Sequence, residues 1–128
     1  MTHPDTAALL ARLTAATGPD RELDAEIYCT LDPTWKAKQA PTAQATGWVS
    51  KGPYTRLAPD YTGSLDAALT LVPENHMWFL GNLDPSDMRF SATISVVGNI
   101  GAEIWRSIHA TAPLALTIAA LRARGIVG

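Results

Sequence analysis

The sequence is poor in the residues from which most metal and redox sites are built. Its 128 residues include one cysteine, Cys29, and three histidines scattered along the chain. A single cysteine cannot form an internal disulfide, which suits a reducing cytoplasm. The histidines and carboxylates show none of the spacings typical of a zinc site. We therefore expect neither a metal nor a cofactor.

The common catalytic motifs are also absent. The chain has no G-x-x-x-x-G-K-[ST] or G-x-G-x-x-G phosphate loop, no H-E-x-x-H and no G-x-S-x-G nucleophile elbow. Four acidic residues cluster in the first turns of one expected helix, where negative charge favours the helix dipole; they are Asp20, Glu22, Asp24 and Glu26. We predict that the protein is not an enzyme.

Low net charge and short apolar runs exclude two classes of partner. The formal net charge is −2, whereas a general nucleic-acid binder needs a broad basic surface. No apolar run approaches the roughly 20 residues of a membrane span. The first residues lack the basic and long apolar regions of a secretory signal. We expect a cytoplasmic protein that binds neither nucleic acid nor membrane.

What the chain does have is the composition of an ordinary globular domain. Hydrophobic residues make up 47% of it, which is typical of folded rather than disordered chains. A chain of 128 residues is long enough for one sizeable core and too short for two. We predict one domain over residues 1–128.

Capping residues followed by apolar residues at helical spacing mark the expected helix starts. The predicted helices run from Asp5 or Thr6 to Gly18, from Asp20 to Leu31, from Thr62 or Ser64 to Val72, and from Thr111 through Leu121 and Arg124 to Gly125. Strands are expected at 48–49, 54–57, 77–80, 89–96 and 102–108. This order predicts an α+β fold in which an antiparallel sheet of about four strands is sandwiched by helices.

The clearest strand is 89–96, where apolar and polar residues alternate as in a half-buried antiparallel strand. Gly98-Asn99 is expected to turn the chain into the next strand. A two-residue loop would place Ile94 opposite Glu103, and a three-residue loop would place it opposite Ile104. The three-residue loop matches apolar with apolar and is the predicted register.

This register assigns side chains to faces of the sheet. It predicts a shared buried face made of Phe90, Ile94, Ile104 and Ile108. It places Trp105 on the opposite face and Arg106 near the end of the apolar face. Because no helix is evident to cover all of the second face, we expect a homo-oligomer that buries it, most simply by a two-fold.

Tyr54, Arg56 and Tyr61 bracket a proline-containing turn just before Thr62. A ligand made of adenine, ribose and phosphates needs a ring for stacking, a guanidinium, and N–H groups at a helix N-terminus. The candidate ligand-binding residues are therefore Tyr54, Arg56, Tyr61 and Thr62, with Arg89, Trp105 and Arg106 from neighbouring strands. The alternative is that the tyrosines are partly buried rings that fix the turn and the arginines are solvated.

Residues 32–47 contain two prolines and show no periodicity. A loop of this length is often functional or mobile. Trp35 and Lys36 within it either form a lid over a site or lie disordered.

Three blocks of the sequence together carry a family resemblance. They are Arg21-Glu22-Leu23-Asp24, then Tyr61-Thr62 with Asp66 and Ala67-Ala68, then Thr111-Ala112-Pro113 followed by Leu116 and Ala119-Ala120-Leu121. The pattern resembles the small phage and prophage "ABA sandwich" domain proteins over residues 18–124. The chain departs from them in its long 32–47 segment and in having Thr117-Ile118 where the last helix usually carries a cysteine. The resemblance implies a small, non-enzymatic accessory product in the cytoplasm of an infected bacterial host.

In size and element order the chain is also similar to the Thoeris anti-defence sponge proteins. This likeness implies a homo-oligomer that binds a cyclic nucleotide or cyclic ADP-ribose type of signal without cleaving it. The alternative is an interaction or structural accessory module whose exposed Trp105 and arginine face docks a host or phage protein. A cationic, aromatic-lined pocket would favour the first function, and a flat apolar patch the second.

Overall fold

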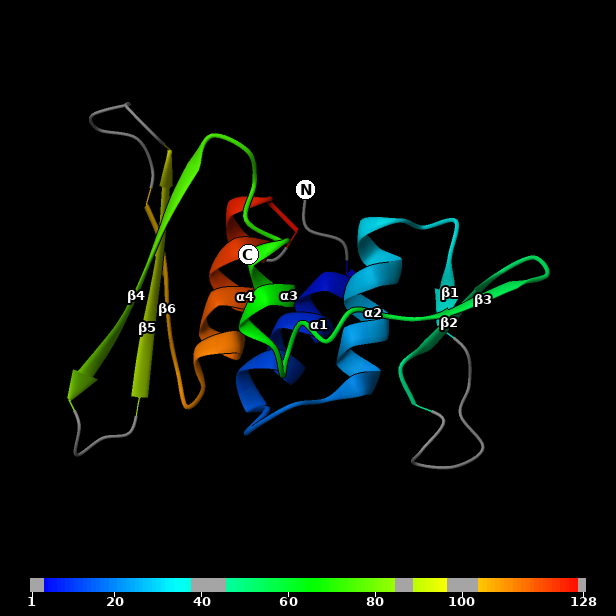
Figure 1. Ribbon diagram of the computed structural model, residues 1–128, viewed down its shortest axis with the longest axis horizontal. Helices are drawn as coiled ribbons and strands as arrows, with labels where there is room; N and C mark the ends of the chain where they lie inside the picture. Colours follow the sequence, from blue (N-terminus) through cyan, green and yellow to red (C-terminus); the bar gives the residue numbers. More distant parts are fainter. Residues whose placement is uncertain (1–3, 38–45, 85–88, 97–103, 127–128) are drawn as a thin grey trace.

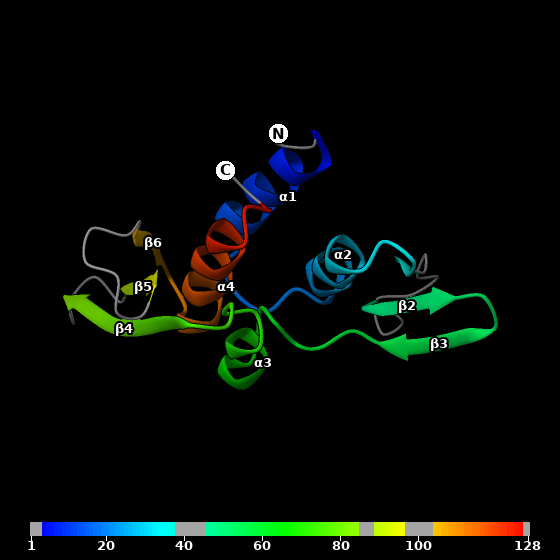
Figure 2. The same ribbon diagram turned by 90° about the horizontal axis from the view of Figure 1, so that it is seen from above.

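The computed structural model describes residues 4–37, 46–84, 89–96 and 104–126. Within these residues the chain forms four helices and six strands, and the strands make two antiparallel three-stranded sheets. The helices lie between the two sheets (Figures 1 and 2). The predicted α+β class is confirmed. In detail, two sheets flank the helices where one sheet of about four strands was expected between them.

Three of the four helices begin directly after a capping side chain. Asp20, Ser64 and Thr111 each accept a hydrogen bond from the backbone N–H three residues later, which satisfies a donor that the first helical turn leaves unpaired. The third helix is a single short turn capped by Ser64, and Thr62 lies outside it. The helices are α1 (Pro4–Ala15), α2 (Arg21–Leu31), α3 (Leu65–Leu69) and α4 (Ala112–Ala123).

The two sheets differ in size and in what covers them. The smaller sheet has the order β1-β2-β3, and its β2–β3 hairpin turns at Gly52, whose positive φ of 59° suits a two-residue turn. The larger sheet has the order β4-β5-β6. The strands are β1 (Lys36–Ala37), β2 (Trp48–Lys51), β3 (Tyr54–Leu57), β4 (His76–Asp84), β5 (Arg89–Val96) and β6 (Ile104–His109).

The main core surrounds α4. Every residue from Leu114 to Leu121 is buried, because α4 packs against β5 and β6 on one side and against α3 and α1 on the others (Figure 1). Such a helix must be apolar nearly all round. Leu9 and Leu13 of α1 and Ile27 of α2 join the same core.

A second, small core lies between α2 and the smaller sheet. Ala25 of α2, Val49 of β2 and Ala58 are buried there, with Tyr28 and Trp35 packed at its edge. The segment predicted as a long loop therefore contains a short strand, β1, and an anchored tryptophan. Residues 38–45 of that segment lie outside the described residues.

No helix in the part of the chain that the structure describes is long and apolar enough to cross a membrane.

The predicted register of the β5–β6 hairpin is wrong by one residue. Ile94 pairs with Trp105, and Ser95 pairs with Ile104. Because side chains alternate along a strand, a shift of one residue moves every side chain of β6 to the other face. The expected turn at Gly98-Asn99 lies outside the described residues.

The shift puts polar side chains on the buried face of β6. Ser107 and His109 are buried there, and Trp105 is half-buried, whereas Ile104 and Ile108 are 61% and 48% exposed. His109 is accommodated because its Nδ1 accepts from the Ala110 N–H at 2.8 Å and its Nε2 donates to the Leu13 carbonyl at 3.1 Å. Matching apolar residues across the hairpin could not reveal these partners.

We predict that Ile94→Ala lowers the free energy of unfolding by about 2–5 kcal/mol, because Ile94 is fully buried and its truncation leaves a cavity. The matched control is Ile108→Ala, which removes the same atoms from a position that is exposed in the single chain and, at a protein concentration low enough to keep the chain monomeric, should cost less than about 1 kcal/mol. Urea denaturation measures both. Equal losses in the two variants would contradict the register.

Candidate functional site

The residues predicted to bind a ligand around Thr62 do not form one site. Tyr54 is 69% exposed on the β2–β3 hairpin, whereas Tyr61 and Thr62 are buried. The Thr62 N–H and hydroxyl both donate to Asp24 Oδ1, at 2.8 and 2.9 Å. The Thr62 hydroxyl also accepts from the Asp20 N–H at 2.7 Å. These polar groups are used inside the protein and are not presented to a ligand.

Asp24 is the centre of this buried network, which joins α2 to the segment before α3. Its Oδ2 accepts from Arg21 Nη1 at 2.7 Å. Arg21 also donates to the Ala58 carbonyl, and its Nη1 lies 3.5 Å from Asp60 Oδ1. The sequence assigned Asp24 to the helix dipole along with its neighbours. Its fully buried position shows that it connects two segments of the fold.

Burial is the main influence on the Asp24 carboxyl. It raises the pKa of Asp24 to about 6, although the Thr62 hydrogen bonds and the Arg21 charge act in the opposite direction. The neighbouring turn is equally crowded: a Cβ on Gly63 would lie 2.6 Å from Asp60 Oδ1. Because the polar groups of the network bond one another inside the protein, we interpret it as structural.

Arg56 of β3 lies beside two aromatic rings. Its Cζ is 5.5 Å from the ring centroid of Tyr28 and 5.7 Å from that of Trp35. Its Nη1 donates to the Tyr28 hydroxyl at 2.9 Å, and the two rings meet edge to face at 5.8 Å. We call these three residues the Arg56 corner. Trp35 thus packs against Tyr28 of α2.

The remaining predicted residues lie on the larger sheet, at the other end of the molecule (Figure 1). Trp105 is half-buried on the face that packs on α4, with its ring centroid 5.9 Å from that of His76. Arg89 and Arg106 are exposed on the opposite face. The predicted pairing of Trp105 with an exposed arginine face is therefore wrong, because the register places them on opposite sides of the sheet.

The opposite face of the larger sheet carries an exposed apolar patch. Its apolar members are Met77 and Phe79 of β4 and Ile104 and Ile108 of β6, and each is at least 40% exposed. Between these columns, β5 contributes a stripe of hydroxyls from Ser91, Thr93 and Ser95. We call this surface the open face. Reasoning from sequence missed it, because the one-residue register error assigned both isoleucines to the core.

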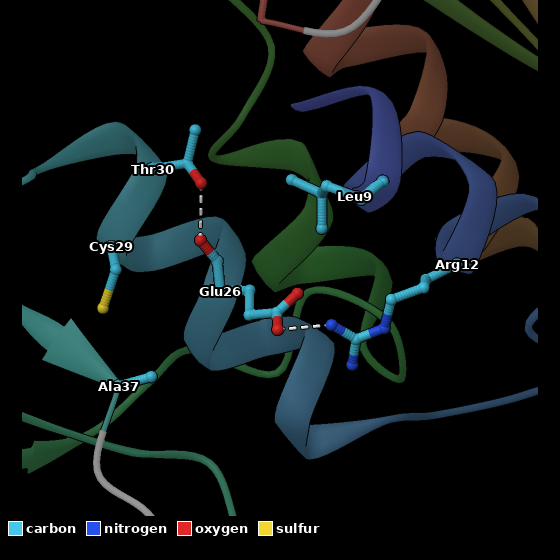
Figure 3. Close-up of a pocket in the computed structure, with 7 residues that line it drawn as sticks. Leu9, Arg12, Glu26, Cys29, Thr30 and Ala37 are labelled. Carbon is cyan, nitrogen blue, oxygen red and sulfur yellow. Dashed lines mark hydrogen bonds and ion pairs between the residues drawn. The ribbon is translucent and has the colours of Figure 1, made fainter. Parts of the chain in front are cut away.

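A hollow of about 340 Å³ lies between α1 and α2 (Figure 3). Arg12 and Glu26 line it and pair with each other across it. Cys29 also lines it, and burial raises the pKa of its thiol, which opposes formation of a nucleophilic thiolate. Arg12 and Glu26 neutralise each other, so we do not assign a catalytic role to this hollow.

A second hollow of about 290 Å³ lies between β6 and α4. Arg106 and Arg122 line it, and Arg122 Nη1 donates to the Arg106 carbonyl at 2.9 Å. The buried His109 at its floor is bonded to backbone groups through both ring nitrogens. The polar groups that line this hollow thus join β6 to α4 and to α1.

Among the residues that the structure describes, no group of three or more histidine, cysteine, aspartate or glutamate side chains could hold a metal ion. Comparison with known protein families, curated proteins and solved structures finds no match. The function must therefore be argued from the two exposed features, the open face and the Arg56 corner.

We predict that Asp24 makes the folded state less stable as the pH rises from about 4 to about 6. Its pKa is higher in the folded protein than in the unfolded chain, so folding favours the protonated form, and this contribution is lost as the pH passes the folded value of about 6. The free energy of unfolding of the wild type minus that of Asp24→Asn should decrease over this range by about 1–3 kcal/mol. Urea denaturation at several pH values measures it. An increase with pH would show that the ion pair with Arg21 outweighs burial.

Proposed function

We propose that the protein is a non-enzymatic interaction module that docks a protein surface on its open face. One observation carries this proposal. Four large apolar side chains are exposed on one sheet face, in two columns on either side of the β5 hydroxyls, and the largest apolar patch on a protein surface is often functional. Patches of this kind mark interaction sites.

The size of the open face suits a protein partner. From their exposed fractions, its four apolar side chains present roughly 400 Å² of surface. Each partner in a standard interface contributes about 800 Å². The hydroxyl stripe of β5 and the Arg106 side chain adjoin the apolar columns and supply polar contacts around them. A small molecule would leave most of this flat surface uncovered.

The hollows support the non-enzymatic part of the proposal. Arg12, Glu26, Arg122 and the buried histidine of these hollows are bonded within the protein, and general acid–base or nucleophilic chemistry needs such groups free to reach a substrate. The resemblance to phage ABA sandwich proteins adds the proposed setting, an accessory protein in the cytoplasm of an infected bacterium.

We predict that a photo-crosslinking residue in place of Phe79 captures a protein in living cells. Phe79→p-benzoylphenylalanine retains an aromatic ring on the open face, midway along β4, where a docked partner would be within reach. The matched control is the same replacement of Tyr54, an exposed ring on the other sheet. Adducts are measured by gel shift and mass spectrometry. No adduct at position 79 above the Tyr54 background would remove the support for this function.

The Arg56 corner favours a second proposal, the sequestration of a nucleotide-derived signal without cleavage. Tyr28 and Trp35 hold the exposed Arg56 guanidinium in place, and such a group binds phosphate through its remaining N–H donors. Tyr54 lies two residues away on the same face of β3 and offers an exposed ring for base stacking. Cyclic nucleotides and cyclic ADP-ribose isomers carry both chemical groups.

We predict for this second function that Arg56→Ala weakens binding about 10- to 150-fold, because one charge-assisted phosphate contact is lost. The matched control is Arg106→Ala, which removes an exposed arginine from the other sheet and should leave binding unchanged. The measurement is the shift in melting temperature with a panel of these nucleotides, which are then recovered intact after heat denaturation. If no nucleotide shifts the melting temperature, sequestration is ruled out and only the interaction module remains.

A further inference from the structure

We propose that the partner of the open face is a second copy of this chain, related by a two-fold axis that runs along β5 between the two faces. This inference rests on the proposed interaction function and names its partner. The support comes from the strand register, from the position of Arg106 on the face, and from the area of the face.

The register arranges the open face in three rows that cross the sheet. Each row takes one residue from β4, one from β5 and one from β6. The rows are Met77–Ser95–Ile104, Phe79–Thr93–Arg106 and Gly81–Ser91–Ile108. In these three rows both outer columns therefore carry apolar side chains and the central column carries hydroxyls, and Arg89 of β5 lies beyond the third row on the same face.

A two-fold along β5 places each row opposite itself with its ends exchanged. In the third row, Ile108 of one copy meets Gly81 of the other, where the missing side chain leaves room for it. In the first row, Met77 meets Ile104, and two flexible or branched apolar chains pack together. The hydroxyl stripe meets itself at the centre. The face is complementary to its own rotated image, as an isologous interface requires.

The second copy also gives the Arg106 charge a partner. Arg106 is exposed and forms no ion pair within the residues that the structure describes, and the described side chains of the open face include no carboxylate. In the middle row the two-fold places the Arg106 guanidinium over the Phe79 ring of the other copy. A cation above an aromatic face is attracted by the ring quadrupole. An acidic partner would satisfy Arg106 but would leave both apolar columns unmatched.

The area is adequate for a stable pair. The apolar side chains supply about half of the roughly 800 Å² that each partner contributes to a standard interface, and the β5 hydroxyls with Arg106 adjoin them. Sheets that pack face to face lie about 10 Å apart with strands aligned to within about 30°. Such a pair would bury the larger sheet on both faces, with α4 on one side and the second sheet on the other.

The axis is tested with cysteines on β5 in a Cys29→Ser background. With the two-fold along β5, Ser91 of one copy faces Ser91 of the other. With a two-fold across the strands, Ser91 would face Ser95. We expect Ser91→Cys alone to form a covalent dimer with a short bismaleimide crosslinker. The matched control, Thr55→Cys on the smaller sheet, should remain monomeric on the denaturing gel.

Dimerisation itself is measured by sedimentation of the full chain at tens of micromolar. We expect the wild type to sediment as a dimer, Phe79→Asp as a folded monomer by circular dichroism, and Leu57→Asp on the smaller sheet as a dimer. A monomeric wild type, or a Ser91→Cys variant that crosslinks only to a Ser95→Cys variant, would overturn the proposal.

The photo-crosslinking experiment separates this inference from the proposed function. An adduct of twice the chain mass supports the second copy. An adduct with a different protein overturns the dimer and leaves the interaction module standing. No adduct together with a monomeric wild type removes both.

Discussion

The burial of α4 on all sides from Leu114 to Leu121 is the constraint on which the rest of the structure depends. A helix that is apolar nearly all round must be covered on every side, and β5, β6, α3 and α1 together do this. The larger sheet consequently packs one face against α4, and its other face is exposed. No second helical layer is found over that free face in the described part of the chain, and its apolar side chains are the most direct indication of function.

The buried Asp24 network sets the position of the other half of the molecule. Through Thr62 and Arg21 it ties the start of α2 to the segment that leads into α3. With that connection fixed, α2 can hold the smaller sheet against Tyr28 and Trp35. The Arg56 corner and the open face are thereby held on separate sheets. One cannot complete the other, which is why they support two different functions and not one composite site.

The sequence could predict only those parts of the site that depend on neighbouring residues of one strand. Arg56 and Tyr54 lie together as expected, because positions two apart on a strand share a face. Tyr61 and Thr62 follow Arg56 closely in sequence but are buried. Tyr61 packs in the main core, and Thr62 is hydrogen-bonded to Asp24. The open face could not be foreseen, because matching apolar residues across the hairpin favoured a register in which Ile104 and Ile108 were buried.

Local sequence determined the α+β class, the caps of α2, α3 and α4, and the alternation along β5, because each depends on neighbouring residues alone. The tertiary structure decided the register of β6, the division of the strands into two sheets and the role of Asp24. These depend on partners distant in sequence: the Leu13 carbonyl bonds His109, and the Thr62 hydroxyl bonds Asp24. A buried polar side chain is stable only where such a partner meets it, and only the folded chain brings the two together.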